Sequence, residues 1–229
     1  MLICKWEKIP NEIKNDVVFE YWKILRKKNF SLFCKRIFDI LASFLLLLIL
    51  SPIFIILAIA IKIDSRGPVF YRQQRVTQYG KKYKIFKFRT MVSNADQIGS
   101  QVTVSNDNRV TKVGKLIRKC RLDEIAQLLN VLGGTMTFVG TRPEVPKYVE
   151  QYTDEMKATL LLPAGVTSEA SIKYKDEDKL LEKAEDADDT YINEVLPGKM
   201  QYNLQSIKKF GFWRDIATMF RTVGAVLKR

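Results

Sequence analysis

An uncharged apolar segment constrains this chain more than any other feature. Residues 40–61 read ILASFLLLLILSPIFIILAIAI, with Ser51 and Pro52 near the middle. About 20 apolar residues cover a hydrocarbon core of roughly 30 Å, so the segment is long enough to cross a bilayer. Proline removes a backbone N–H and clashes with the preceding turn, so we expect the helix to break or bend at Pro52.

The flanking charges favour one of two membrane topologies. Lys35 and Arg36 precede the segment, and two further cations follow it at Lys62 and Arg66. The positive-inside tendency then places both ends on the cytosolic side. A re-entrant helix over residues 35–63, broken into two halves of about 17 Å that dip into one leaflet, satisfies this charge pattern. A kinked helix that spans the bilayer once is the alternative.

The composition narrows both the chemistry and the partners. The 229 residues include 38 Lys and Arg, 25 Asp and Glu, and no His, giving a formal net charge of +13. The lack of histidine excludes Ser-His-Asp and Cys-His catalysis and His-ligated zinc. Beside the apolar segment, the positive charge favours anionic lipid of the inner leaflet or a phosphate-bearing substrate, and nucleic acid is not expected as a partner.

The remaining residues are expected to form one small α/β domain that is mostly helical. Residues 1–34 are interpreted as an interfacial helical extension, with a solvated helix as the alternative, and residues 64–229 as the main domain. A strand is expected to begin at residue 69, and others to cover 83–89 and 136–139. Helices are expected over 113–119, 122–132, 144–162 and, at the membrane interface, 206–229, with an acidic solvated surface over 176–194.

Asp123 and Glu124 open the expected helix 122–132 and have two interpretations. Acidic residues stabilise a helix N-terminus by about 0.3–1 kcal/mol, which explains the pair without any function. The functional interpretation uses the neighbours Arg118 and Arg142, whose planar guanidinium groups match phosphate oxygens. A carboxylate kept ionised by these arginines can attack phosphorus while the adjacent carboxylate holds Mg²⁺. Nearby Cys120 has no histidine to activate it and is interpreted as a packing residue.

Seven short motifs occur in an order that resembles the monotopic phosphoglycosyl transferases, bacterial enzymes that start glycan assembly on a polyprenyl phosphate. The resemblance covers about residues 33–172 and is carried by Lys35-Arg36-Ile37-Phe38-Asp39, the apolar segment with Ser51-Pro52, Gly67-Pro68-Val69-Phe70, Lys87-Phe88-Arg89-Thr90-Met91, Arg109-Val110-Thr111, Leu122-Asp123-Glu124 and Val139-Gly140-Thr141-Arg142-Pro143-Glu144.

The resemblance implies a specific activity and place in the cell. It implies transfer of a phospho-sugar from a UDP-sugar to undecaprenyl phosphate, with release of UMP, as the first membrane step of glycan assembly. The fold implied is a small cytosolic catalytic domain with a Pro-broken re-entrant membrane helix and interfacial amphipathic helices. Its place is the cytosolic face of the bacterial cytoplasmic membrane, and a homodimer is a further possibility.

The resemblance also implies roles for individual residues. Asp123 becomes the nucleophile that forms a covalent phospho-sugar intermediate, and Glu124 becomes the Mg²⁺ ligand. Arg118 and Arg142 are expected near the substrate phosphates. Arg89 is expected to join them, with a structural ion pair as its alternative. Ser51 and Pro52 correspond to the break in the membrane helix, which begins at Lys35, Arg36 and Asp39.

The chain departs from the family pattern at two positions. Thr141 stands where the family commonly has proline, and Ser168 where it commonly has glycine. Both changes leave the identity of the sugar open. Two functions of other classes also remain open: a non-catalytic membrane-anchored binding protein, and a single-span subunit of a polysaccharide export complex.

Overall fold

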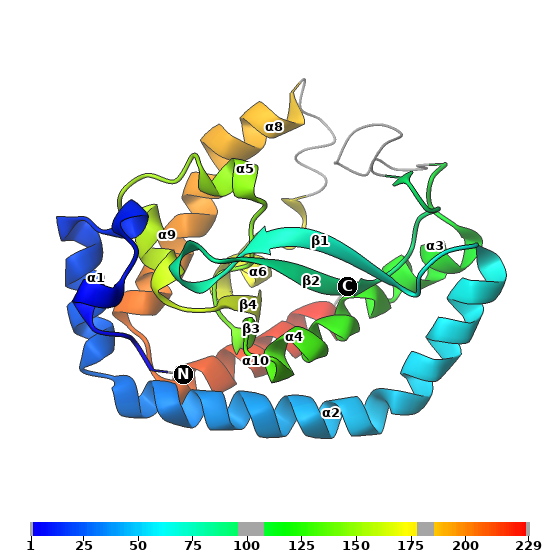
Figure 1. Ribbon diagram of the computed structural model, residues 1–229, viewed down its shortest axis with the longest axis horizontal. Coiled ribbons are helices and arrows are strands. Elements are labelled where there is room, and N and C mark those ends of the chain that lie inside the picture. The colour runs from blue at the N-terminus through cyan, green and yellow to red at the C-terminus, as the bar shows by residue number, and fades with distance from the viewer. Residues whose placement is uncertain (1, 96–107, 178–185, 228–229) are drawn as a thin grey trace.

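Figure 1 shows a computed structural model of the chain, which describes residues 2–95, 108–177 and 186–227. In chain order the elements are α1 (Asp16–Arg26), α2 (Asn29–Asp64), β1 (Phe70–Val76), β2 (Lys82–Phe88), α3 (Lys112–Lys119), α4 (Leu128–Leu132), β3 (Met136–Val139), α5 (Pro146–Val149), β4 (Ala164–Thr167), α6 (Glu169–Lys173), α8 (Ala187–Thr190), α9 (Leu196–Lys208) and α10 (Phe212–Leu227). Short 3₁₀ helices lie between them, namely η1 (Trp6–Lys8), η2 (Asn11–Ile13), η3 (Gln78–Gly80), η5 (Leu122–Gln127) and η6 (Met156–Leu161), together with one turn of π-helix, η7 (Tyr191–Val195).

Two small sheets support a mostly helical domain. Strands β1 and β2 form an antiparallel hairpin, and β3 and β4 form a parallel pair. The strands expected near residues 69, 83–89 and 136–139 are confirmed. The helix expected over residues 122–132 begins as the 3₁₀ helix η5 and continues as α4.

The single helix expected over residues 144–162 is wrong. Only α5 and η6 are helical there, and a turn separates them. Tyr152 in this turn is buried in the core, and the Thr153 hydroxyl accepts a hydrogen bond from the Met156 amide at the start of η6. Asn15 also donates to the Asp154 carbonyl. These contacts favour a turn because they use groups that a continuous helix would pair internally.

The N-terminal segment contributes to the largest hydrophobic core. Ile9, Ile13, Val18 and Leu25 are buried in one cluster that also contains apolar residues of η6 and α9. Several apolar positions expected at the membrane interface, Ile9, Ile13 and Leu25 among them, therefore lie inside the protein. The segment is an integral part of the folded domain, whereas its position relative to a membrane stays a prediction.

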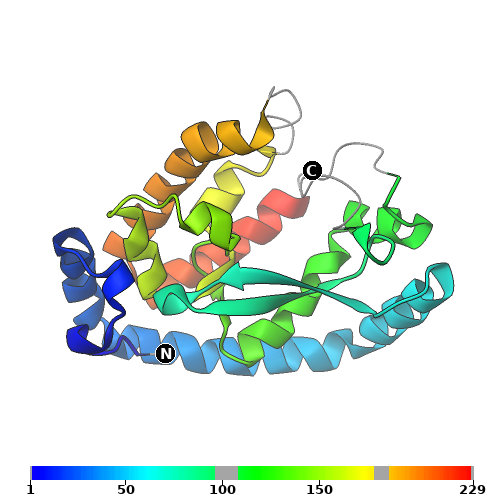
Figure 2. The ribbon, with the colours of Figure 1, turned by 45° about the horizontal axis from the view of Figure 1, so that its top comes forward.

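Helix α2 lies along one side of the molecule, with the other elements above it (Figures 1 and 2). Leu32, Lys35, Asp39 and Ser43 are buried at helical spacing in its first half. Lys35 forms an ion pair with Asp215 of α10, and Asp39 accepts hydrogen bonds from the Thr137 hydroxyl and the Phe138 amide of β3. The first half of α2 is thereby fixed to the domain through one face.

The last turns of α2 are fixed to the same domain. Leu57 and Ile61 pack in a second core cluster with Phe88 of β2 and Ile117 of α3. Asp64 accepts a hydrogen bond from the Val113 amide at the start of α3, with 2.9 Å between Oδ2 and N. Both halves of α2 are therefore attached to one folded domain.

The expected break at Pro52 is a bend within one continuous helix. Proline cannot donate the hydrogen bond that would reach the Leu48 carbonyl four residues earlier. The Ser51 hydroxyl donates to that carbonyl instead, at 2.8 Å. Pro52 is the single proline inside α2, which turns upward toward its C-terminal end (Figure 1). The Ser-Pro pair thus bends the helix without leaving that carbonyl unpaired.

The outer face of α2 is a broad exposed apolar surface. Its large exposed residues are Phe30, Phe33, Ile37, Ile40, Leu41, Phe44, Leu45, Leu46, Leu48, Ile49, Ile53, Ile55, Ile56, Ile59 and Ile63. Helix α10 adds Trp213, Phe220 and Val223. Exposed apolar surface of this extent is typical of a membrane-binding face, and α2 has the length and composition of a membrane helix.

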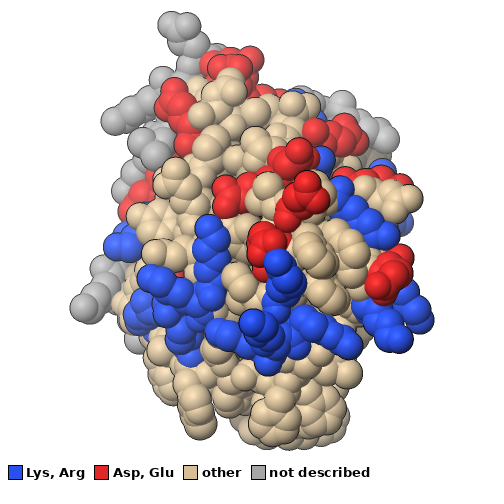
Figure 3. All heavy atoms as spheres, turned by 90° about the vertical axis from the view of Figure 1, so that its left-hand side faces the viewer, with Lys and Arg blue, Asp and Glu red and all other residues tan. Residues whose placement is uncertain are grey.

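Charged side chains are layered above this apolar surface. In Figure 3, Lys and Arg form a band over a base without charged residues, and most Asp and Glu lie farther from that base. Lys23 and Arg26 come from the last turn of α1 and are exposed. A band of cations next to an apolar face matches an anionic headgroup layer next to hydrocarbon. Part of the acidic segment 176–194, residues 178–185, lies outside the described residues.

Candidate active site

The carboxylates Asp123 and Glu124 lie at a sharp corner between α3 and η5. Arg121 adopts the left-handed conformation, with φ of 53°, directly before η5, and its amide donates to the Arg118 carbonyl of α3. This conformation ends α3 and starts a new helical turn in another direction. Asp123 and Glu124 occupy the first turn of η5. A non-glycine residue with positive φ is strained, and such strain concentrates at functional sites.

Asn130 fixes this corner to the hairpin. Its buried amide side chain accepts a hydrogen bond from the Phe86 amide and donates to the Lys84 carbonyl, at 2.8 and 3.2 Å. Both partners are backbone groups of β2, so the η5–α4 segment cannot slide along the strand. Lys87, three residues after Lys84, is thereby held opposite Glu124.

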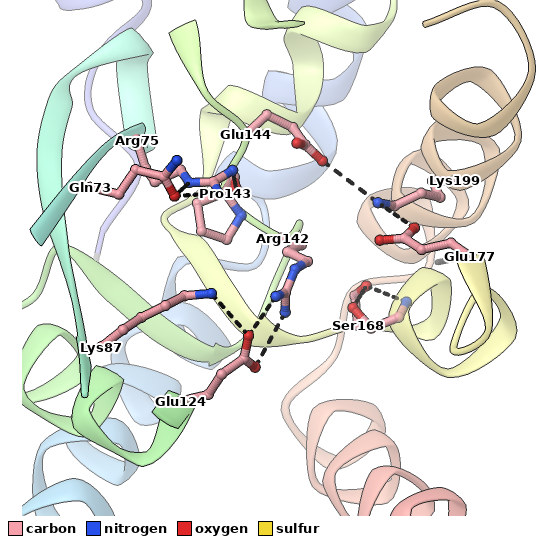
Figure 4. A network of polar contacts seen from close by, with 11 residues as sticks. Gln73, Arg75, Lys87, Glu124, Arg142, Pro143, Glu144, Ser168, Glu177 and Lys199 are labelled. Atoms are coloured by element: carbon pink, nitrogen blue, oxygen red, sulfur yellow. Dashed lines mark hydrogen bonds and ion pairs between the residues drawn. The ribbon is translucent and has the colours of Figure 1, made fainter. Parts of the chain in front are cut away.

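The Glu124 carboxylate is contacted by two positively charged side chains. Arg142 donates to both of its oxygens, with distances of 2.6 Å to Oε1 and 3.5 Å to Oε2, and Lys87 Nζ lies 3.3 Å from Oε1 (Figure 4). Burial alone would raise the pKa of Glu124, but Arg142 and Lys87 outweigh it and hold that pKa well below its usual range. Glu124 is therefore ionised at neutral pH.

Asp123 differs from Glu124 in its electrostatic environment. Burial, followed by the adjacent Glu124 charge, raises the pKa of Asp123, while Lys87 and Arg118 oppose that increase. Asp123 is half-buried. A carboxylate that is partly desolvated and lies close to cations is suited to nucleophilic attack on phosphorus.

Arg142 is held in place by a rigid backbone arrangement around β3 and β4. The Gly140 amide donates to the Thr167 carbonyl, and the Gly165 amide donates to the Thr141 carbonyl at 2.8 Å. A Cβ atom on Gly165 would lie only 2.2 Å from the Gly140 nitrogen, so this close approach requires glycine. Arg75 of β1 donates from NH1 to the Pro143 carbonyl at 3.2 Å on the other side of Arg142.

The other two expected arginines are placed differently. Arg118 Nε donates to the Thr90 hydroxyl at 2.8 Å, and its charge lowers the pKa of Asp123, so Arg118 belongs to the surroundings of the site. Arg89 is buried and donates to the Ser65 and Arg66 carbonyls just beyond α2. The described contacts of Arg89 therefore link it to the end of the membrane helix and not to Glu124, and its phosphate-binding role stays a prediction.

Two residues of the hairpin, Lys87 and Arg75, lie at the site but are not among the site residues predicted from the sequence. Lys87 belongs to one of the motifs and Arg75 to none, and Tyr83, the first residue of the predicted strand 83–89, lies next to them. Tyr83 and Lys87 alternate on one face of β2, and Arg75 lies opposite Tyr83 in the register. The alternation of a strand could have grouped them, but the pattern was obscured because lysines and aromatic residues occupy both faces.

A network of buried polar side chains lies next to the Arg142 loop, on the side away from Glu124. Glu144 accepts a hydrogen bond from the Tyr191 hydroxyl at 2.6 Å, and Lys199 lies 3.7 Å from Glu144 and 3.0 Å from Glu177 (Figure 4). Glu144, Tyr191 and Lys199 are each less than 10% exposed. Since Glu144 follows Arg142 by two residues, this network anchors the arginine loop to η7 and α9.

The two departures from the family pattern line one pocket. Thr141 and Ser168 lie on its wall with Arg214 and Asp215 of α10. Ser168 also has a local structural role, because its hydroxyl caps α6 by accepting from the Ser171 amide at 3.0 Å. Cys120 was expected to be a packing residue, and this was wrong: it is exposed at the end of α3, where the chain turns before η5.

The described residues contain no preformed metal cage, so the expected Mg²⁺ stays a prediction. No cluster of three or more Asp, Glu or Cys side chains able to hold a metal is present in the part of the chain that the structure describes. Mg²⁺ in phosphoryl-transfer sites typically takes one or two carboxylates, waters and substrate phosphates. Glu124, the residue expected to hold Mg²⁺, supplies one such carboxylate. The contacts of Glu124 with Arg142 and Lys87 do not fit a permanent metal cage, because a cation would compete with them.

The fold and the site define a class of protein: a mostly helical domain on a long apolar helix, with a carboxylate pair surrounded by arginine and lysine. Residues 30–229 match the family described as bacterial sugar transferase, and the chain belongs to this family. The motif resemblance noted in the sequence is thereby confirmed.

Three relatives show the range of similarity. The chain is 36% identical over 198 residues to the UDP-N-acetylgalactosamine-undecaprenyl-phosphate N-acetylgalactosaminephosphotransferase of Aeromonas hydrophila, covering 85% of this chain and 44% of the relative. It is 38% identical over 194 residues to the UDP-glucose:undecaprenyl-phosphate glucose-1-phosphate transferase of Escherichia coli K12, covering 82% and 39%. It is 30% identical over 207 residues to the exopolysaccharide production protein ExoY of Rhizobium meliloti, covering 84% of each. The chain thus spans about two fifths of the first two relatives and most of the third.

Proposed function

We propose that this protein transfers a phospho-sugar from a UDP-sugar to undecaprenyl phosphate and releases UMP. The observation that carries the proposal is the pair Asp123 and Glu124, in which Arg142 and Lys87 contact Glu124 and the charges of Lys87 and Arg118 act on Asp123. The names of the relatives support the substrate class, because the first two transfer sugar phosphates to undecaprenyl phosphate. The sugar itself is left open, because these two relatives use different sugars.

The proposed chemistry has two steps that share one site. In the first, an Asp123 carboxylate oxygen attacks the phosphorus that carries the sugar, the bond to the bridging oxygen breaks, and UMP leaves with the bonding electrons. In the second, an oxygen of undecaprenyl phosphate attacks the same phosphorus and Asp123 leaves as a carboxylate. The product is a polyprenyl-diphosphate-linked sugar.

The surrounding cations make this attack electrostatically feasible. An anionic nucleophile approaching a diphosphate is repelled unless positive charge is fixed nearby. Arg142 and Lys87 supply that charge, and Arg142 can contact phosphate through two nitrogen atoms. Bound Mg²⁺, held by Glu124 and the substrate, would neutralise developing charge on the phosphate oxygens.

We further propose that the protein is monotopic, on the cytosolic face of the cytoplasmic membrane. This placement is supported by the attachment of both ends of α2 to one domain, through Asp39 and Asp64. It is also supported by the exposed apolar faces of α2 and α10, and by the band of cations above them (Figure 3). A water-soluble UDP-sugar and a lipid with its phosphate at the interface then meet at one site.

Release of UMP tests the proposal. Detergent-purified protein is incubated with Mg²⁺, undecaprenyl phosphate and each member of a panel of UDP-sugars. We expect UMP from one or a few sugars and none from Asp123→Ala. If folded protein releases no UMP from any UDP-sugar, the proposed activity is wrong. If UMP release survives Asp123→Ala, the proposed nucleophile is wrong.

A further inference from the structure

Tyr83 carries a buried hydroxyl with no hydrogen-bond partner among the described residues. Its ring packs against Ile85, Val131 and Met136, which form a small core cluster under the hairpin. The packing fixes the direction of the ring and therefore the position of the hydroxyl. A phenylalanine would fill this space equally well without the free-energy cost of a buried, unpaired polar group, so core packing does not explain the hydroxyl.

The surroundings of the Tyr83 hydroxyl are cationic. Arg75 is the direct cross-strand partner of Tyr83 in the hairpin, and its NH1 group is hydrogen-bonded to the Pro143 carbonyl, beside Arg142. The charges of Arg75 and Arg142 both act to lower the pKa of Tyr83, although burial keeps that pKa above its usual value. A hydroxyl that needs an acceptor thus lies near two guanidinium groups, of which Arg75 also donates to the Gln73 side chain and Arg142 is paired with Glu124 in this structure.

The same face of the hairpin reaches the proposed reaction centre. Lys87 lies four residues beyond Tyr83 on β2 and contacts Glu124 at 3.3 Å. The pKa of Lys87 is lowered, first by burial, and it responds to the charges of Glu124, Arg142, Asp123 and Arg75. These groups therefore belong to one electrostatic environment, which Tyr83 borders.

We propose that Tyr83 is a further substrate-binding residue, whose hydroxyl donates a hydrogen bond to an acceptor oxygen of the phospho-sugar on the side of the site formed by Arg75 and Arg142. The inference rests on the proposed function and adds a residue to it. The acceptor is an oxygen either of the sugar-bearing phosphate or of the sugar. Both are acceptors for the O–H of Tyr83, which has no acceptor among the described residues.

The test compares Tyr83→Phe with wild-type protein in UMP release and in thermal stability without substrate. We expect kcat/KM for the UDP-sugar to fall about tenfold or more, because the deleted hydroxyl bonds to substrate. We expect the melting temperature to stay the same or rise, because the hydroxyl has no protein partner to lose. A merely structural residue would not give this combination.

Tyr79→Phe is the matched control. The Tyr79 hydroxyl accepts a hydrogen bond from the Cys4 amide at 3.0 Å, in the N-terminal part of the core. Removing it should lower the melting temperature and leave kcat/KM unchanged. Each variant loses one hydroxyl oxygen, but Tyr83→Phe should lower kcat/KM without lowering the melting temperature, and Tyr79→Phe should do the reverse.

The outcomes distinguish a phosphate acceptor from a sugar acceptor. They also distinguish failure of the role proposed for Tyr83 from failure of the proposed function. An equal loss for every accepted UDP-sugar assigns the bond to the phosphate, and a loss that depends on the sugar assigns it to the sugar. A Tyr83→Phe protein with unchanged kcat/KM for all UDP-sugars overturns the role of Tyr83 alone. Wild-type protein that releases no UMP from any UDP-sugar overturns the proposed function and this inference with it.

Discussion

Lys35 of α2 and Asp215 of α10 form an ion pair inside the protein, with 2.5 Å between Nζ and Oδ2 and side chains only 3% and 16% exposed. The pair joins the two helices that carry most of the large exposed apolar residues. Burial raises the pKa of Asp215, and the Lys35 charge opposes that increase. The ion pair therefore sets how the apolar faces of α2 and α10 are oriented relative to each other.

Breaking this pair from one side should destabilise the protein strongly. Lys35→Met leaves Asp215 buried without its cation, which typically costs about 3–5 kcal/mol. The double change Lys35→Met with Asp215→Leu removes both charges and should recover most of that loss. The free energy of unfolding, measured by denaturant titration in detergent, checks both values. Equal stability of Lys35→Met and wild type would show that the pair does not hold the two helices together.

Ser51 and Pro52 should be energetically coupled. In wild type, Ser51→Ala leaves the Leu48 carbonyl without its 2.8 Å hydrogen bond and should cost about 1–2 kcal/mol. In a Pro52→Ala background the amide at position 52 can donate to that carbonyl, so adding Ser51→Ala should change little. A double-mutant cycle of unfolding free energies gives the coupling. Additive effects would mean that the serine hydroxyl does not compensate for the proline.

The two ends of α2 should be found on the same side of the membrane. In a background with the three natural cysteines replaced by serine, a cysteine is introduced at exposed Glu20 of α1, which directly precedes α2, or at exposed Lys62 in the last turn of α2. Neither should react with a membrane-impermeant maleimide in intact cells, and both should react after permeabilisation. Labelling of one position and not the other in intact cells would indicate a spanning helix.

Lowering the pH should inhibit the enzyme by protonating Asp123, and Arg118 should set the pH at which this inhibition occurs. The attacking carboxylate must be ionised, so kcat/KM falls as the pH falls through the pKa of Asp123. The Arg118 charge lowers that pKa. Arg118→Gln should therefore move the acid limb of the pH–rate profile for kcat/KM to higher pH. An acid limb that stays in place or moves to lower pH would contradict the assignment of Asp123 as the ionising nucleophile.

Much of the candidate site could be predicted from the sequence, because its residues fall within short motifs. Asp123 and Glu124 are adjacent in the chain, and Arg142 lies in a loop marked by glycine and proline. Such local signals survive without knowledge of the fold. Glu124 and Arg142 do lie together, at 2.6 Å.

The remainder depends on contacts between distant parts of the chain. The sequence presents Lys35 as a flanking charge of a membrane helix. In the fold it is buried and paired with Asp215, 180 residues away. Arg89 belongs to a motif near the site, yet its two terminal nitrogens donate to backbone carbonyls just beyond α2. Tyr83 shares a face of β2 with Lys87, but only the fold pairs it with Arg75 across the hairpin and brings it near the charge of Arg142. Partners of this kind cannot be predicted from motif spacing.

The central claim is the covalent bond between Asp123 and the phospho-sugar, and a single-turnover experiment without undecaprenyl phosphate tests it most directly. Protein is mixed with Mg²⁺ and its accepted UDP-sugar, quenched, and analysed for UMP and for the mass of the peptide that contains Asp123. We predict about one UMP per active site and a phospho-sugar adduct on that peptide, with neither in Asp123→Asn. UMP that forms only when undecaprenyl phosphate is present, or a burst that survives Asp123→Asn, would contradict the account.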